Sequence, residues 1–258
     1  MCSIPGRIRK LALAVAAAMA GVGLGGGALA GETVSIEASV DWVTAYLWHG
    51  MRITNNPVIQ PSVTVSAYGI SLNTWGSIDV TDVNEDNGED YRLQEVDYTV
   101  SYSYSPMEGL DLEGGLACYT FSGFDSTREV FLTATLSKVP LSPSLSAYYD
   151  VDEANGFYVN AGVEHGFEIT KKLGLTLAGG VGWGSSKYHE YYFGDTAHDA
   201  LSDAQVTATL SYAFTDYLSL SVYGGYAALI NSEVRDLGDE TYGNADTPFG
   251  GISIGLSF

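Results

Sequence analysis

The chain has 258 residues, with 31 Asp and Glu against 11 Lys and Arg, and a formal net charge of −20. Such acidity argues against nucleic-acid binding, which needs a basic surface, and against general adhesion to anionic lipid. The length fits one sizeable domain, and no linker or shift in composition divides it.

The first thirty residues have the pattern of a secretory signal peptide. Arg7, Arg9 and Lys10 supply a positive start, and residues 11–30 then carry no charge. Small residues at Ala28 and Ala30 suit a signal peptidase, so we expect cleavage after Ala30. A transmembrane helix is the alternative, but the glycines within 21–27 make it a poor helix. We therefore assign 1–30 to the signal peptide and 31–258 to the mature domain.

Two-residue alternation of apolar and polar side chains recurs along the mature chain. The first segment, 34–42, places apolar side chains on one face and Ser, Glu and Asp on the other. Segments of about ten residues with this period suit strands that cross a bilayer at a tilt. We predict strands over 34–42, 70–79, 95–104, 110–119 and 205–212, and others centred near residues 64, 133, 147, 161, 178, 222 and 253.

The connections between these strands alternate in length. Short turns and longer loops interleave as in an outer-membrane barrel, whose short turns face the periplasm. The final segment ends on Phe258, the usual last residue of such proteins, and needs a partner strand. We therefore predict an all-β fold, a closed antiparallel transmembrane β-barrel of about twelve strands, with the first and last strands paired. The short turns are 68–69, 105–109, 138–142, 168–172 and 215–217, and the long loops are 50–59, 81–93, 122–128, 152–156, 185–203 and 228–247.

Aromatic residues cluster at the predicted strand ends, as in the girdles at membrane interfaces. Tyr46, Trp48, Tyr149, Trp183 and Tyr226 are assigned to the loop-end girdle by their alternation. A soluble barrel or sandwich, the alternative, would place its aromatic residues in the middle of strands. The alternation predicts lipid-facing side chains at Val100, Leu112, Leu132, Val163, Leu177, Leu210 and Leu220.

The opposite face of the strands is acidic and rich in small residues. Unpaired carboxylates do not stay ionised in a dry interior, so they predict water in the lumen. A wet acidic pore attracts cations and repels anions. Bulky side chains such as Trp75, Tyr119, Phe121, Tyr148 and Tyr223 are expected to narrow it. The predicted pore-lining residues are Glu37, Asp41, Asp79, Glu95, Asp97, Asp111, Glu113, Asp150 and Glu164.

No catalytic motif stands out, and no cofactor or specific metal site is predicted. His189 and His198 share a long loop with acidic residues, which we interpret as a solvated acidic loop rather than a catalytic rim. His165 has lipid-facing alternation and His49 lumenal alternation. The loop 82–90 resembles the start of a calcium loop, but its glycine and closing residue are out of place. Only weak attraction of divalent cations is expected there.

Residues 39–80 resemble the opening of the TorF-like family of outer-membrane porins. The resemblance is carried by 45–50 (Ala-Tyr-Leu-Trp-His-Gly), 57–61 (Pro-Val-Ile-Gln-Pro) and 69–77. His49 stands where that family has Arg. The resemblance implies a porin-like channel in the Gram-negative outer membrane, whose partners are membrane lipids and small solutes or cations.

Three functions follow as hypotheses. The first is passive diffusion of small cationic or neutral solutes. The related MltA-interacting family suggests the second, an outer-membrane scaffold for wall-remodelling enzymes with an unidentified protein partner. The third, an outer-membrane enzyme, requires a catalytic triad at the rim of the barrel.

Overall fold

The structure, a computed structural model, describes residues 34–81, 92–194 and 198–258. Its main feature is one closed barrel in which strands adjacent in the chain pair antiparallel and β1 pairs with β14. This confirms the predicted closed barrel of twelve strands. The predicted signal peptide and the 82–90 loop lie outside the described residues. The barrel strands are β1 Ser35–Val43, β4 Val58–Ala67, β5 Ile70–Asp79, β6 Leu93–Met107, β7 Leu110–Phe121, β8 Thr127–Thr135, β9 Ser144–Asp150, β10 Phe157–Thr170, β11 Leu173–Gly184, β12 Ala200–Ala213, β13 Leu218–Leu229 and β14 Asp246–Ser257.

The seam that closes the barrel joins the first and last strands. Val40 of β1 faces Ile254 of β14 on one side and Pro61 of β4 on the other. The Ile36 amide donates to the Phe258 carbonyl at 3.0 Å, and the Phe258 amide donates to the Ile36 carbonyl at 2.9 Å. The sheet therefore has no free edge, as a strand pair in lipid requires.

The outer surface of the barrel is apolar in the pattern that the alternation predicts. Val100, Leu132, Val163, Leu177 and Leu210 are all exposed, and Leu132 keeps 57% of its surface. Leu112 and Leu220 are half-buried. They lie on the same outer face, because Leu112 pairs with the exposed Tyr104 and Leu220 pairs with the exposed Tyr212. Large apolar side chains that stay outside the fold indicate a surface that faces lipid.

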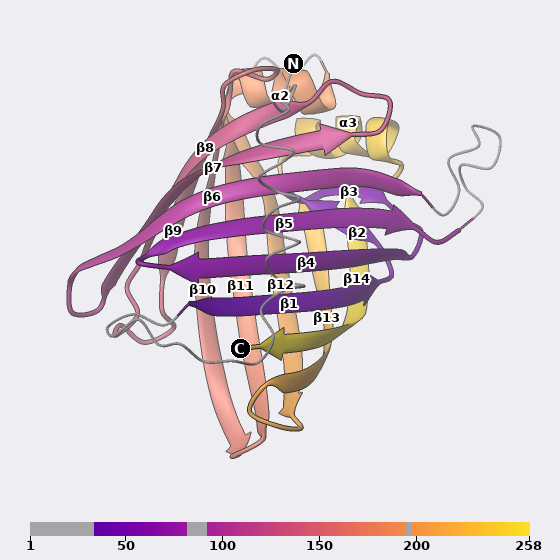
Figure 1. The fold of residues 1–258 in the computed structure, drawn as a ribbon. Helices are drawn as coiled ribbons and strands as arrows, with labels where there is room; N and C mark the ends of the chain where they lie inside the picture. The colour runs from indigo at the N-terminus through magenta and orange to yellow at the C-terminus, as the bar shows by residue number, and fades with distance from the viewer. Residues whose placement is uncertain (1–33, 82–91, 195–197) are drawn as a thin grey trace, which may run out of the picture.

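The two ends of the barrel differ. One end, which we call the turn end, carries the short connections; the other, the loop end, carries the long ones. At the loop end, the chain between β1 and β4 forms a hairpin of β2 (Tyr46–Trp48) and β3 (Met51–Thr54). Helices α2 (Ser186–Phe193) and α3 (Ser232–Tyr242) lie at the same end, as Figure 1 shows. Neither of these described helices has the length and hydrophobicity to cross a bilayer.

Local sequence explains where α3 begins and ends. The Asn231 side chain accepts from the amides of Glu233 and Val234 at 3.0 and 3.2 Å, which caps the first turn. At the other end Gly243 has φ 73°, a left-handed conformation that glycine adopts without steric cost. Our sequence analysis treated 185–203 and 228–247 as plain loops, so both helices are additions to the predicted fold.

Candidate functional site in the barrel lumen

The β2–β3 hairpin lies inside the loop end of the barrel. Its two-residue turn, His49-Gly50, has φ values of 47° and 76°, as the tight turn of a β-hairpin requires. A Cβ added to Gly50 would lie 2.2 Å from the Cβ of Asp203 on β12, so only glycine allows this approach. The tip of the hairpin therefore reaches across to the β12 wall.

Aromatic rings along the hairpin contact several strands of the wall. Tyr46 contacts Trp75 of β5 at 5.4 Å between ring centroids, and Trp48 contacts Tyr119 of β7 at 5.8 Å. The His49 ring stacks on Tyr158 of β10. Contacts with strands on different sides of the barrel place the hairpin in the lumen.

This position corrects one prediction. Tyr46 and Trp48 were assigned to the lipid-facing girdle by extending the alternation of β1. The strand ends at Val43 and the chain bends at Thr44 and Ala45, which breaks the alternation. Both rings therefore turn inward, because the two-residue period holds only within one continuous strand.

His49 lies at the centre of the aromatic contacts. Its ring stacks on Tyr158 with centroids 3.8 Å apart and an interplanar angle of 12°, and its Nδ1 is hydrogen-bonded to the Tyr188 hydroxyl at 3.0 Å. Burial lowers the pKa of His49 to about 3, because removal from water disfavours the charged ring. His49 is therefore neutral at pH 7. The Tyr158 hydroxyl donates to Asp203 Oδ1 at 2.9 Å, which extends the contacts to the β12 wall.

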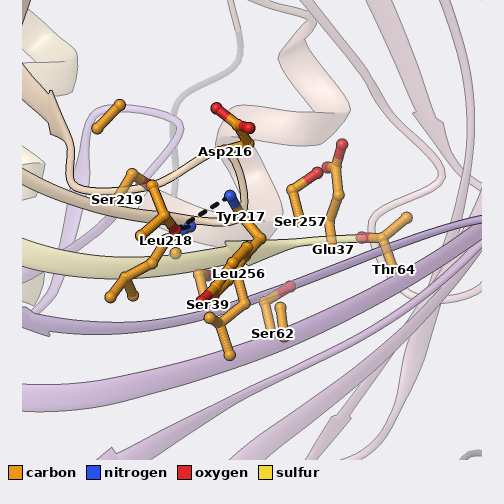
Figure 2. Close-up of a pocket in the computed structure, with 14 residues that line it drawn as sticks. Glu37, Ser39, Ser62, Thr64, Asp216, Tyr217, Leu218, Ser219, Leu256 and Ser257 are labelled. Carbon is orange, nitrogen blue, oxygen red and sulfur yellow. Dashed lines mark hydrogen bonds between the residues drawn. The ribbon is translucent and has the colours of Figure 1, made fainter. Parts of the chain in front are cut away.

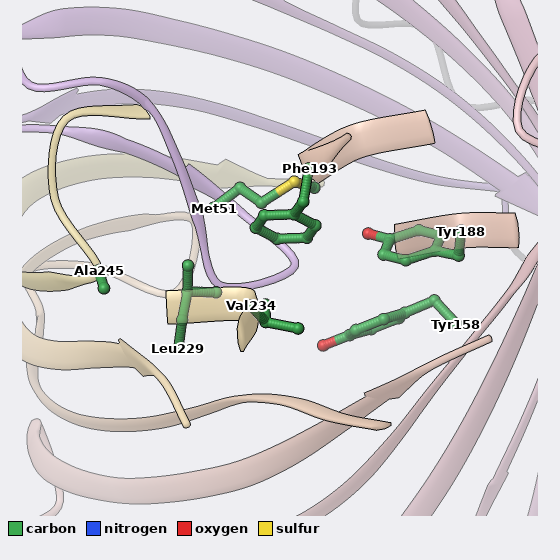
Figure 3. Close-up of a cluster of buried hydrophobic side chains, with 7 residues drawn as sticks. All are labelled: Met51, Tyr158, Tyr188, Phe193, Leu229, Val234 and Ala245. Atoms are coloured by element: carbon green, nitrogen blue, oxygen red, sulfur yellow. The ribbon is translucent and has the colours of Figure 1, made fainter. Parts of the chain in front are cut away.

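Helices α2 and α3 hold the hairpin from the loop end. Arg52 Nη2 donates to the carbonyl of Tyr242, the last residue of α3, at 3.0 Å. The Tyr242 hydroxyl in turn donates to the Tyr192 carbonyl of α2 at 2.7 Å. We call the hairpin and the two helices (46–54, 186–193 and 232–242) the plug. Figure 3 shows the buried cluster that the plug forms with the wall: Met51, Tyr158, Tyr188, Phe193, Leu229, Val234 and Ala245.

His189 also differs from its prediction as part of a solvated loop. It lies in α2 and is completely buried, and its Nδ1 donates to the His198 carbonyl at 3.0 Å. Burial lowers the pKa of His189. Helix formation explains the difference, since one face of α2, with Tyr188, His189 and Phe193, packs inward.

Four of the predicted pore-lining acids lie near the plug. Asp79 and Glu95 are 4% and 6% exposed and line a cavity of 680 Å³ beside the hairpin. Asp97 lies two residues further along the same inward face of β6 and is 9% exposed. Asp150 is fully buried, and its Oδ1 accepts from the amides of residues 152, 153 and 154 at 2.8–3.2 Å. Asp150 therefore caps the β9–β10 loop.

The other five predicted acids lie in the middle of the lumen and toward the turn end. Glu164 lines a cavity of 350 Å³ together with His49, Asn160 and Gln205. Glu37 lines a second cavity of 340 Å³ at the turn end, with serines and threonines (Figure 2). Asp41 accepts from Ser39 Oγ at 3.2 Å nearby. Asp111 and Glu113 follow each other along the inward face of β7. The nine predicted pore-lining acids therefore form two groups along the lumen. Four lie near the plug, and five lie in the middle and toward the turn end.

Two inward acids were missed by the sequence analysis. Glu129 is 1% exposed and accepts from the Tyr119 hydroxyl at 2.8 Å. The exposed Val130 and Leu132 follow it on β8, so the alternation could have revealed it. Asp203 was harder to find, because the β11–β12 register shifts between Val181 and Trp183. An irregularity of this kind interrupts the two-residue period on which the prediction rests.

The architecture defines the class of protein: an outer-membrane type β-barrel with an apolar outer band, a polar lumen and a plug at one mouth. A family model, that of the MltA-interacting protein MipA, matches residues 24–236. The chain belongs to this family. The TorF-like family remains a resemblance over the first strands. A search of curated proteins found no match.

Two solved outer-membrane channels have a similar fold. The KdgM porin superposes with a TM-score of 0.51 at 12% identity, over 87% of this chain and 99% of the porin. The COG4313 outer membrane channel from Pseudomonas putida F1 gives 0.51 at 12% identity, over 92% and 100% of the two chains. At this identity the likeness concerns the fold alone.

Proposed function

We propose that the chain is a porin-like channel of the Gram-negative outer membrane for passive diffusion of small cationic or neutral solutes. In this conformation the plug occupies part of the lumen at the loop end. The apolar band of the barrel meets membrane lipid, and the predicted signal peptide provides export. We place the loop end outside the cell and the turn end in the periplasm, as in other barrels of this class.

The observation that carries the proposal is the imbalance of charge on the inner wall. Among the described barrel strands Arg128 is the single Lys or Arg, and its side chain pairs with Asp152 at 2.6 Å at the loop end. The acids of the middle and turn end, Glu37, Asp41 and Glu164 among them, have no basic strand residue to neutralise them. A narrow acidic passage favours cations over anions.

Liposome swelling with the purified barrel tests this function. We expect proteoliposomes to admit a small organic cation and a neutral sugar of similar size faster than an organic anion. Variants that loosen the plug, described in the Discussion, should increase all three rates and keep their order. Equal exclusion of the three solutes by wild-type and loosened barrels would contradict a diffusion channel.

A second candidate, a scaffold, is favoured by the family assignment and by the closed plug. The family is named for an interaction with MltA. At the turn end the β8–β9 connection exposes Val139 and Leu141, apolar side chains on which a periplasmic protein could pack. Capture of MltA by the wild-type barrel, with loss of capture in Val139→Asp and Leu141→Asp, would support the scaffold. Retention in both variants would exclude this surface.

A further inference from the structure

The 680 Å³ cavity beside the hairpin, which we call the outer cavity, has a composition unlike the rest of the lumen. Three parts of the molecule enclose it: the hairpin with residues 52–56, the end of α3 at Tyr242, and the loop ends of β5, β6 and β7. Its volume lies within the range of about 300–1,000 Å³ that is usual for small-molecule sites. The cavity is thus large enough for a small ligand without movement of the plug.

Carboxylates form the part of the cavity that belongs to the wall. Asp79 and Ser77 share the inward face of β5, and Ser77 pairs with Glu95 of β6. Tyr46 of the hairpin lines the same cavity beside Glu95. The acidic groups therefore come from neighbouring strands and lie at the same level. A positive ligand group would be attracted to them strongly, because they are almost fully buried.

Aromatic rings form a second part of the wall. Phe121 of β7 pairs with Glu95, so both side chains lie on the same inward face. Phe121 nevertheless keeps 36% of its surface exposed, and Phe124 keeps 81%. Both line the outer cavity together with Tyr46 and Tyr242. Exposed rings beside carboxylates are the combination that binds ammonium groups through cation–π contacts.

The one basic side chain among the lining residues is already engaged. Arg52 donates to the Tyr242 carbonyl at the C-terminal end of α3, where the helix dipole favours a cation. A bare metal ion suits the cavity less well. Within the described residues no group of three or more His, Cys, Asp or Glu side chains is arranged to hold one. An organic cation makes use of both the carboxylates and the rings.

We propose that the outer cavity binds a small organic cation, an ammonium group on a compact apolar body. Its carboxylates attract the charge and its rings contact the methyl or methylene groups. The site goes beyond the proposed channel function, because binding at the loop end requires no passage through the barrel. Asn55, Asn56 and Gln94 at the same cavity can bond polar groups at the far end of the ligand.

Calorimetric titration of the full mature chain in detergent tests the site with two probes. Choline carries the ammonium group, and 3,3-dimethylbutan-1-ol is its neutral analogue of the same shape. We expect saturable binding of choline, and binding of the alcohol at least about tenfold weaker, since burial near carboxylates rewards only the charged probe. Equal affinity for the two probes, or no saturable binding of choline by the wild type, would overturn the proposal.

Two variants and two matched controls locate the binding. Glu95→Gln removes a carboxyl group from the cavity, and Phe124→Ala removes an exposed ring whose loss leaves the packing intact. Each should weaken choline binding about fivefold or more. Glu37→Gln and Phe214→Ala make the same changes at the turn end and should leave the affinity unchanged. Circular dichroism checks that each barrel remains folded. If the variants and the controls then bind choline with the same affinity, the proposed site is wrong.

Discussion

The loop end and the turn end of the lumen are built on the same strands, yet among the described residues a plug lies at the loop end and none at the turn end. At the loop end the rings of His49 and Tyr188 contact Tyr158 of the wall, and Arg52 joins the hairpin to α3. At the turn end Glu37, Ser39 and Ser62 line a cavity. The alternation of the strands supplies an inward polar face at both ends. The loops, rather than the barrel strands, therefore make the difference between the two ends.

Truncation of Tyr188 should reduce the difference between the two ends more than any other change. The side chain is fully buried and contacts the hairpin and β10. Truncation of such an aromatic residue in Tyr188→Ala should cost the plug about 3–5 kcal/mol. We expect a large rise in single-channel conductance while the barrel stays folded. Tyr212→Ala, an exposed ring on the outer face of β12, is the control and should change conductance little. An unchanged conductance in Tyr188→Ala would show that the plug does not close the passage.

The lipid face and the lumenal face should respond differently to the same charge. Leu210 is exposed on the outside of β12, and its neighbour Thr209 points into the lumen beside Tyr223. Leu210→Arg should destabilise the barrel by about 2–4 kcal/mol if it lies near the bilayer midplane, whereas Thr209→Arg should cost much less. Denaturant titration in lipid vesicles measures both. Similar losses in the two variants would contradict the assigned faces.

Protonation of His49 should loosen the plug as the pH falls. Burial lowers the pKa of His49 to about 3 from 6.5, so the opened state binds the proton more tightly than the closed state. The contribution of His49 to the stability of the plug is therefore fully present above pH 6.5 and is lost as the pH falls from 6.5 toward 3. At pH 5 the loss should be about 2 kcal/mol, at about 1.4 kcal/mol per pH unit.

Hydrogen exchange of the plug amides at pH 7 and pH 5, corrected for intrinsic rates, measures this effect. The change should shrink in His49→Gln, which does not titrate. A residual dependence of the same sign is expected from His189, whose pKa burial also lowers. An equal pH response in His49→Gln and the wild type would assign the effect to other groups.

The smallest expected effect concerns the charges of the wall. Asp97→Asn with Glu113→Gln should lower the cation preference of the open channel, because both side chains face the lumen. The double variant Glu153→Gln with Glu190→Gln removes the same number of carboxyl groups from exposed positions at the loop end. It should lower the cation preference less. The reversal potentials of the two double variants, both in the Tyr188→Ala background, measure the difference. If the exposed pair caused the larger loss of cation preference, the charges that select cations would lie outside the strands.

The barrel could be predicted from the sequence because each strand repeats one local rule. Val100, Leu132 and Leu210 follow the two-residue period, and the closing of β1 on β14 follows from the need to pair every edge. The plug could not be predicted in the same way. Tyr46 and Trp48 turn inward after a bend, and their positions depend on partners such as Trp75 and Tyr119 that are distant in the chain.

Part of the plug did leave a signal in the sequence. Asn231 followed by Glu233, with Gly243 after the last turn, is the usual pattern of a helix start and stop. The packing of that helix over the hairpin had no comparable signal, because it depends on contacts such as that between Arg52 and the Tyr242 carbonyl. Among the acids, Glu129 was within reach of the alternation, whereas the shifted register of β11 and β12 concealed Asp203.

The central claim is that an acidic lumen selects cations once the plug yields. The most direct test is the reversal potential of the Tyr188→Ala barrel in a planar bilayer under a salt gradient. We predict a potential of the sign set by cations, which declines as salt rises from about 0.1 M to about 1 M and the Debye length falls from about 10 Å to about 3 Å. A potential of the sign set by anions, or a barrel that stays sealed with its plug loosened, would contradict the account.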